Sequence, residues 1–389
     1  MSKPTVVILG ILGRTPFAGV AWQLLHFLEG FRACGYDAYY VEDTGTWPYD
    51  RERNTVSADC GFTVRYIGGL MERLGLGDRW AYRAASMNGQ VFGLSSAELD
   101  RLIERAAAIV NLTGATILRD EHLRVPVRIY LETDPVLPQI EVAEERAFTI
   151  DLLRAHTHHF TFGERIGSPT CEVPALEFTY QPTRQPIVLD WWRNGDVGRR
   201  AEHPFTTIAS WRQTDKDICW KGQTLTWSKH HEFMKVIDLP QRSGRRFELA
   251  LAALEDADQD LLRSYGWAVI DALALSSDPD SYREFIRTSR GEFTVAKEQN
   301  VRLRSGWFSD RSACYLAAGR PVITQETGFS ELLPTGRGLF GFLSEDEVLA
   351  ALDAIEADYD LHSRAAEEIA EEYFGADRVV SQLARRAGL

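Results

Sequence analysis

The chain has 389 residues, more than a single hydrophobic core usually supports, so two domains of similar size are expected. Its formal net charge of −13 argues against sequence-independent binding to nucleic acid or to an anionic membrane, because both require a basic surface. The five cysteines are scattered and form no C-x-x-C pair, which argues against a disulfide framework and a structural zinc site. No apolar run approaches the ~20 residues that span a bilayer. We therefore expect a cytoplasmic protein that binds neither nucleic acid nor membrane and holds no metal.

The first half of the chain alternates strands with helices. Residues 5–10 form a continuous apolar run rich in β-branched side chains, which is typical of a strand buried on both faces. Apolar residues at helical spacing over 20–34 predict a helix that Gly35 ends. Further strands are predicted at 37–43, 107–114, 127–131 and 158–164. This order predicts a parallel sheet with right-handed crossovers.

A second alternating series follows the turn-rich tract at 182–200, where we place the domain boundary. Strands are predicted at 205–211, 267–274, 291–295 and 321–324. Helices are predicted at 247–254, 280–289, 310–318, 344–355 and 361–389. The simplest α/β fold for this pattern is two Rossmann-like doubly wound domains facing each other across a cleft, with ligands at the carboxyl ends of the strands.

The segment 306–329 carries the most information about function. Ser309 or Asp310 is a competent N-cap for the helix at 310–318, and Gly319 suits its C-terminal end. A helix N-terminus suits a diphosphate, particularly beside the hydroxyls and guanidinium of Ser309, Arg311 and Ser312. A capped amphipathic helix without a ligand has the same residues, so both interpretations stay open at this point.

The segment Ala317-Ala-Gly-Arg-Pro-Val-Ile, followed by Thr327-Gly-Phe, Leu332-Leu-Pro-Thr-Gly-Arg-Gly and Ser344-Glu-Asp-Glu, resembles the C-terminal half of GT-B glycosyltransferases. The resemblance is specific over 291–389 and elsewhere rests on the order of elements. It implies an enzyme that moves a sugar from a nucleotide sugar, with UDP or dTDP, to a small-molecule or glycan-precursor acceptor, without metal or cofactor. It also implies an acceptor-binding domain at 1–185, a donor-binding domain at 186–375, and a helix at 376–389 that packs back towards the first domain.

The chain departs from the family in one respect. Many retaining members carry two glutamates in this segment that contact the donor sugar and the ribose. The corresponding positions fall near Gly306 and on Cys314, so neither is acidic. The ribose contact and the stereochemical outcome therefore stay open, with Asp310 or Glu326 as candidate substitutes.

Further donor-binding candidates stand near predicted strand ends and loops. Lys297 follows the strand at 291–295, where an ammonium group would neutralise a phosphate, although a solvated surface lysine is the equal alternative. Ser228 and Lys229 lie in a polar and aromatic segment, where a simple helix cap at Ser228 is the alternative. Gly13 and Arg14 follow the first strand, which the resemblance places beside the reaction centre, and a plain tight turn explains them equally well.

Transfer of a sugar to a hydroxyl group needs a base for the proton. The catalytic candidates are carboxylates just past strand ends of the first domain, namely Glu42, Asp134 and Glu164. Asp134 is the first choice, because Pro135 keeps its loop out of a helix. Each of the three also suits an ordinary helix cap or solvated acid. His158 and His159 point to opposite faces of a strand, so they do not form a metal site.

Two other functions remain open. A nucleotide-sugar epimerase or hydrolase on the same fold would use a donor without an acceptor. A catalytically silent binding protein is the second alternative, because the paired glutamates are missing. Under the donor-binding hypothesis, Arg311→Ala is expected to abolish stabilisation by a nucleoside diphosphate and to leave the unliganded melting temperature nearly unchanged.

Overall fold

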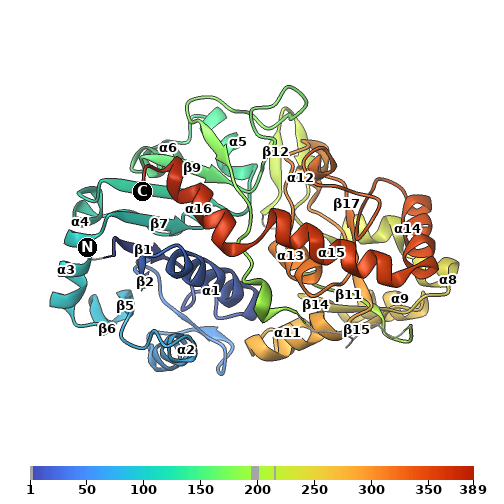
Figure 1. The fold of residues 1–389 in the computed structure, drawn as a ribbon, viewed down its shortest axis with the longest axis horizontal. Coiled ribbons are helices and arrows are strands. Elements are labelled where there is room, and N and C mark those ends of the chain that lie inside the picture. Colours follow the sequence, from blue (N-terminus) through green and yellow to red (C-terminus); the bar gives the residue numbers. More distant parts are fainter. Residues whose placement is uncertain (1–2, 194–200, 214–215) are drawn as a thin grey trace.

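The computed structural model describes residues 3–193, 201–213 and 216–389, which form two α/β domains side by side (Figure 1). The first domain has an eight-stranded sheet in the order β10-β9-β8-β7-β1-β2-β5-β6. Its strands are β1 (Thr5–Leu9), β2 (Asp37–Glu42), β5 (Trp80–Ala84), β6 (Gln90–Gly93), β7 (Ala108–Leu112), β8 (Val127–Glu132), β9 (His158–Thr161) and β10 (Tyr180–Pro182). All neighbours pair in parallel except β5 and β6.

Helices cover both faces of this first sheet. Alternate residues of β1 belong to different core clusters: Val6 and Ile8 join one, Val7 and Leu9 the other. The helices are α1 (Ala18–Ala33), α2 (Gly61–Arg73), α3 (Ser96–Arg105), α4 (Asp120–Leu123), α5 (Leu137–Ala143) and α6 (Ala147–Arg154). A short hairpin of β3 (Tyr49–Asp50) and β4 (Thr55–Val56) follows β2. The continuous apolar runs predicted this two-sided burial correctly.

The second domain has a six-stranded, fully parallel sheet in the doubly wound order β15-β14-β11-β16-β17-β18. Its strands are β11 (Phe205–Ser210), β14 (Phe247–Ala252), β15 (Ala268–Asp271), β16 (Gly291–Thr294), β17 (Val322–Gln325) and β18 (Leu339–Phe342), beside a hairpin of β12 (Ile218–Trp220) and β13 (Gln223–Leu225). The helices are α7 (His230–Phe233), α8 (Leu239–Ser243), α9 (Asp256–Ser264), α10 (Ala272–Leu275), α11 (Pro279–Thr288), α12 (Glu298–Arg302), α13 (Asp310–Ala317), α14 (Glu345–Ala357) and α15 (Tyr359–Tyr373).

The predicted helix at 247–254 is wrong, because these residues form strand β14. Alanine and leucine favour helices, but β14 lies between β11 and β15, and Leu249, Ala250 and Leu251 are at most 3% exposed. The tertiary pairing overrides the local propensity. The predicted strand at 267–274 is also shorter than expected, since Asp271 caps α10 by accepting a hydrogen bond from Leu273 N (2.8 Å).

The chain crosses between the domains twice, and the two crossings run side by side. Ile187 N donates to Phe374 O (2.7 Å), and Ala376 N donates to Ile187 O (2.9 Å). Beyond the second crossing, α16 (Ala376–Arg386) lies along α1 of the first domain (Figure 1). A Cβ atom on Gly30 would come within 2.6 Å of Val380 Cγ2, so the glycine permits this close approach.

Residues 194–200, the end of the tract taken as the domain boundary, lie outside the described residues. Just before them, Trp192 is fully buried and donates its indole N–H to His26 Nε2 of α1 (3.0 Å). Across the described parts of the chain, no helix combines the length and the apolar character that a bilayer crossing requires.

Candidate functional site

A cavity of about 550 Å³ lies between the carboxyl edges of the two sheets. The first domain lines it with the loops after β1, β7 and β8, through Thr15, Thr113 and Thr133, and with the start of α1. The second domain contributes the ends of β11, β14 and β15 and three cationic side chains, Lys229, Lys297 and Arg311. Small-molecule sites usually measure about 300–1,000 Å³ and lie at this edge of doubly wound sheets.

Lys229 brings a positive charge into the cleft, where the nearby carboxylates of the described residues, Glu292 and Asp134, already pair with Arg311 and Lys297. The residue is only 9% exposed, and within the described residues its ammonium group has no hydrogen-bond or ion-pair partner. Burial, and then the positive charges of Arg311 and Lys297, lower the pKa of Lys229 to about 7. Burying an unpaired cation is unfavourable. The arrangement therefore suits an anion that enters the cleft and supplies the missing charge.

Lys297 follows β16 and forms an ion pair with Asp134, which follows β8 of the first domain. Its ammonium nitrogen also lies 3.5 Å from the centre of the Trp227 ring, in cation–π geometry. Trp227 Nε1 donates to Gln213 Oε1 (2.9 Å), which fixes the ring. Burial lowers the pKa of Lys297, and the Asp134 charge opposes that shift. Two residues predicted separately from strand ends are thus brought together.

Arg311 lies at the floor of the cleft in a buried ion pair. Its Nε donates to Glu292 Oε1 (2.6 Å), and its Nη1 donates to the carbonyl oxygen of Ile208 (2.6 Å). Its Nη2 donates to Thr294 Oγ1 (3.0 Å). These bonds tie α13 to β16 and β11. Arg311 lines the cavity, but its charge is largely matched by Glu292, which is fully buried.

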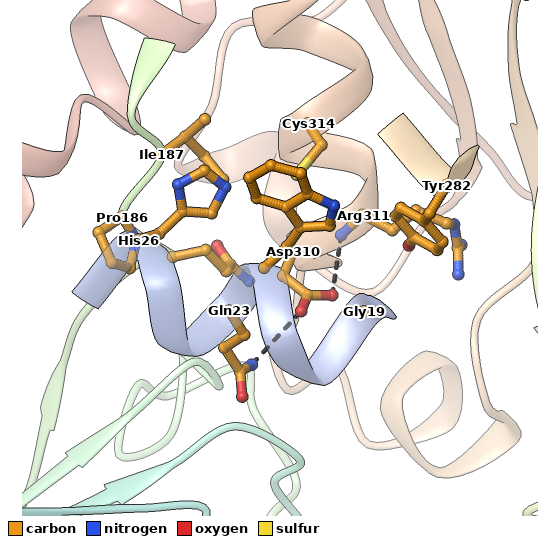
Figure 2. Close-up of a pocket in the computed structure, with 11 residues that line it drawn as sticks. Gly19, Gln23, His26, Pro186, Ile187, Tyr282, Asp310, Arg311 and Cys314 are labelled. Atoms are coloured by element: carbon orange, nitrogen blue, oxygen red, sulfur yellow. Dashed lines mark hydrogen bonds between the residues drawn. The ribbon is translucent and has the colours of Figure 1, made fainter. Parts of the chain in front are cut away.

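The N-terminus of α13 faces helix α1 of the first domain. Asp310 Oδ1 accepts from Arg311 N (2.8 Å), and Asp310 Oδ2 accepts from Gln23 Nε2 (3.3 Å), as Figure 2 shows. Ser309 and Ser312 are at most 5% exposed, and neither lines the cleft. The cavity beside this helix end measures about 10 Å³, room for about one water molecule. A diphosphate does not fit there, but Asp310 and Arg311 at the same helix start also line the larger cleft, which has room for one.

Glu42 holds the loop after β1 through hydrogen bonds to the backbone of that loop. Its carboxylate accepts hydrogen bonds from Gly13 N (2.6 Å), Arg14 N (3.0 Å) and the Tyr40 hydroxyl (2.6 Å). The residue is 1% exposed, and burial raises the pKa of Glu42 to about 7. The carboxylate and the two backbone N–H groups satisfy one another, while Thr15, the next residue in the loop, lines the cleft. Glu42 therefore does not face the cavity, and the side chain of Arg14 is exposed.

Three other candidates hold local structure away from the cavity. Glu164 pairs with Arg184 (2.7 Å) beneath α16, and burial raises the pKa of Glu164. Glu326 accepts from Gly328 N in the turn after β17. Ser228 Oγ accepts from Gln213 N (2.7 Å) and shapes the loop that carries Lys229. A position at the end of a strand therefore does not by itself distinguish a residue that lines the cleft from one that holds local structure.

Among the described residues, one cluster has the spacing of a metal site: Asp43, Glu121 and His122. Arg83 pairs with Asp43 (3.1 Å) and Glu121 (3.1 Å), so the carboxylates already have a cationic partner. His122 Nδ1 accepts a hydrogen bond from Arg119 N (3.2 Å). The neutral ring then carries its proton on Nε2, which leaves no free ring nitrogen to ligate a metal.

Glu292 is a site residue that the sequence analysis did not single out. It lies in β16 between Gly291 and Phe293, in a strand whose four residues are all buried. A lone acid in such a strand requires a buried cation, and Arg311 supplies it. A single acidic residue inside a predicted buried strand was therefore the sequence feature that could have identified Glu292.

No protein-family model and no curated protein sequence matches the chain. Solved structures do match over the full length. AviGT4, a glycosyltransferase of avilamycin A biosynthesis, has a TM-score of 0.58 at 12% identity and covers 99% of this chain and 97% of its own. HepE of Anabaena, in complex with UDP-glucose, has a TM-score of 0.58 at 12% identity, with 99% of both chains covered.

A third similar structure is an alpha-glucosyltransferase in complex with UDP and a DNA 13-mer. Its TM-score is 0.56 at 9% identity, with 100% of both chains covered. At such identities the likeness establishes the fold. It confirms the resemblance to GT-B glycosyltransferases and the α/β class predicted from the sequence. The chain therefore has the GT-B fold of these glycosyltransferases, with two Rossmann-like domains facing each other across a cleft.

Proposed function

We propose that the protein transfers a sugar from a nucleoside-diphosphate sugar to an acceptor bound by the first domain. The observation that carries the proposal is the buried ammonium group of Lys229, unpaired among the described residues, beside Lys297 in a cleft of about 550 Å³. Two close cations, of which Lys229 has no ion-pair partner among the described residues, suit a diphosphate. UDP is the first nucleotide to test, because UDP and UDP-glucose are bound in similar structures.

In the proposed reaction, Lys229 and Lys297 hold the diphosphate and stabilise the charge that develops on it as it leaves. Arg311 fixes the floor of the cleft through Glu292. Asp134 is the base, since its carboxylate lies at the carboxyl edge of the first sheet beside Lys297. The two lysines supply the positive charge that a metal would otherwise bring, so we propose that transfer needs neither metal nor cofactor.

The acceptor is proposed to be a small molecule or a glycan precursor. One similar structure contains DNA, but the net charge of −13 does not favour a polyanionic acceptor here. Of the donor-binding residues predicted from the sequence, Lys229, Lys297, Asp310 and Arg311 line the cleft, and we propose Lys229 and Lys297 as the contacts to the diphosphate. Cys314, aligned with the second family glutamate, borders the cavity of about 10 Å³ together with Asp310, which stays the candidate substitute for that carboxylate.

A thermal-shift panel of UDP, dTDP, GDP and ADP tests donor binding, since a ligand of the native state raises its apparent stability. We expect one diphosphate to stabilise the protein and Lys229→Met to remove that shift. Lys221→Met, which removes an exposed lysine of the same domain, is the matched control and should keep it. A shift that survives Lys229→Met would refute the assignment of the diphosphate site.

Turnover separates the proposed transferase from its alternatives. Donor consumption that requires an added acceptor supports transfer, and equal consumption without acceptor supports a hydrolase or epimerase. Tight binding of UDP-glucose without turnover against a broad acceptor panel would instead support a binding protein. Activity that survives treatment with a chelator supports the proposed independence from metal.

A further inference from the structure

The ion pair between Lys297 and Asp134 connects the two domains beside the cleft, which is lined by Lys297 itself and by Thr133, the residue before Asp134. Lys297 follows β16 of the second domain, and Asp134 follows β8 of the first. Their side chains are 15% and 39% exposed, respectively. Partly exposed ion pairs contribute little to stability, because water competes for both charges. A ligand of higher charge in the cleft is therefore able to replace one partner.

The loop that carries Asp134 is held rigidly. Val136 has a φ of 94°, which is rare for a β-branched residue and persists only where the surroundings impose it. Its N–H donates to Gln139 Oε1 (2.7 Å), and Gln139 Nε2 donates to both carboxylate oxygens of the buried Glu132 (2.8 and 2.9 Å). This network fixes the backbone of the loop around Asp134, so an exchange of partners requires rotation of side chains and no movement of the loop.

Lys297 is the partner that is free to turn. Its ammonium group stands on a flexible four-carbon chain, and the residue lines the cavity directly. The ammonium nitrogen lies 3.5 Å from the centre of the Trp227 ring, and this cation–π contact stabilises the charge independently of Asp134. A rotation of the side chain into the cavity thus requires no movement of the backbone.

The second cation makes that rotation favourable when a diphosphate is present. Lys229 lines the same cavity and has no ion-pair partner within the part of the chain that the structure describes, and its pKa is lowered in part by the nearby charge of Lys297. A diphosphate carries more than one negative charge, whereas Asp134 carries one. Placed between the two lysines, the diphosphate attracts Lys297 more strongly than the carboxylate does.

We infer that donor binding breaks the Asp134–Lys297 pair: the diphosphate takes Lys297, and the released carboxylate becomes the base for the acceptor. The inference rests on the proposed function. In the transfer step, Asp134 accepts the hydroxyl proton while the acceptor oxygen forms its bond to the anomeric carbon. The bond from that carbon to the diphosphate oxygen breaks, and its electron pair leaves with the diphosphate. Asp134 stays paired with Lys297 until the donor is bound and cannot accept a proton before then. The donor therefore binds before the acceptor.

Calorimetric binding of UDP to Asp134→Asn tests the exchange. The variant keeps the shape of the side chain and removes the competing charge, so UDP should bind about three- to tenfold more tightly than to the wild type. Asp151→Asn is the matched control, because it makes the same charge change at an exposed position of α6 in the same domain. Its UDP affinity should equal that of the wild type.

A double-mutant cycle identifies Lys297 as the group that is exchanged. Lys297→Met should weaken UDP binding, and adding Asp134→Asn to it should then have little effect. Unchanged or weaker binding by Asp134→Asn in the wild-type background would overturn the inference. Equal tightening in the Lys297→Met background would also overturn it, because the effect would then be direct repulsion of phosphate. A wild-type protein that binds no UDP would refute the uridine donor itself.

Discussion

Arg311 and Glu292 form a buried ion pair under the floor of the cleft, with Nε and Oε1 2.6 Å apart and Glu292 fully buried. The pair changes the expectation for Arg311→Ala that the sequence suggested. Removing the guanidinium leaves an uncompensated carboxylate in the core, which costs about 3–5 kcal/mol in comparable cases.

We therefore expect Arg311→Ala to lower the free energy of unfolding by about 3–5 kcal/mol, measured by urea denaturation without ligand. The double variant Arg311→Met, Glu292→Leu should recover much of that loss, because neither charge is then left unpaired. An unchanged denaturation midpoint for Arg311→Ala would show that Glu292 is not held as an ion in the core.

The affinity for UDP should depend on pH through Lys229. In the empty cleft its pKa is lowered to about 7 by burial and by Arg311 and Lys297, while Glu292 and Asp134 oppose the shift. A bound diphosphate stabilises the ammonium form, so above about pH 7 binding must take up a proton. UDP affinity should then fall by up to about tenfold per pH unit towards about pH 9. Calorimetry in buffers of different ionisation enthalpy measures the proton uptake, which Lys229→Met should abolish.

Lys229 should also lower the stability of the empty protein near neutral pH. Its pKa of about 7 in the folded state lies below the usual value of 10.5, so between these values the unfolded chain binds the additional proton. Stability from this group therefore rises with pH through that window and is lowest below about pH 7. Lys229→Met should raise the free energy of unfolding by about 2–4 kcal/mol near neutral pH, and less near pH 10. A variant with unaltered stability across the window would show that the ammonium group is hydrated.

Asp134 and Glu164 provide a direct comparison of two strand-end acids. Asp134→Asn should reduce the rate of transfer by about 10²–10⁴-fold, which is the usual contribution of a general base. Glu164→Gln should leave kcat/KM nearly unchanged, because Glu164 pairs with Arg184 beneath α16. Steady-state kinetics with UDP-glucose and a responsive acceptor measures both. A large loss of activity in Glu164→Gln alone would reverse the assignment.

Glu42→Gln tests whether this buried acid is structural. Both carboxylate oxygens of Glu42 accept hydrogen bonds, from Gly13 N, Arg14 N and the Tyr40 hydroxyl. In a glutamine the NH2 group replaces one of these oxygens and cannot accept, so at least one of the three hydrogen bonds is lost. We expect a loss of about 1–3 kcal/mol in stability, measured by denaturation, with UDP binding retained. Loss of activity in a variant of unchanged stability would instead indicate a catalytic role.

The order of elements was predictable because strand and helix signals are local. Apolar runs and helical spacing mark β1 and α1 without knowledge of the rest of the chain. The failure at 247–254 has the same origin: a strand buried on both faces has no alternation, and its leucines and alanines equally suit a helix. Its neighbours β11 and β15 decide the outcome, and they are distant in sequence.

For the cleft, the sequence by itself determined which residues stand at the carboxyl ends of strands, and parallel topology gathers such ends along one edge of each sheet. That was enough to select Asp134 and Lys297. Only the tertiary structure decided that these two meet across the domains, that Lys229 lacks a partner among the described residues, and that Glu42 binds the backbone of a loop. Pairing and burial arise from the docking of surfaces far apart in the chain, and electrostatic free energies depend on those distances rather than on residue type.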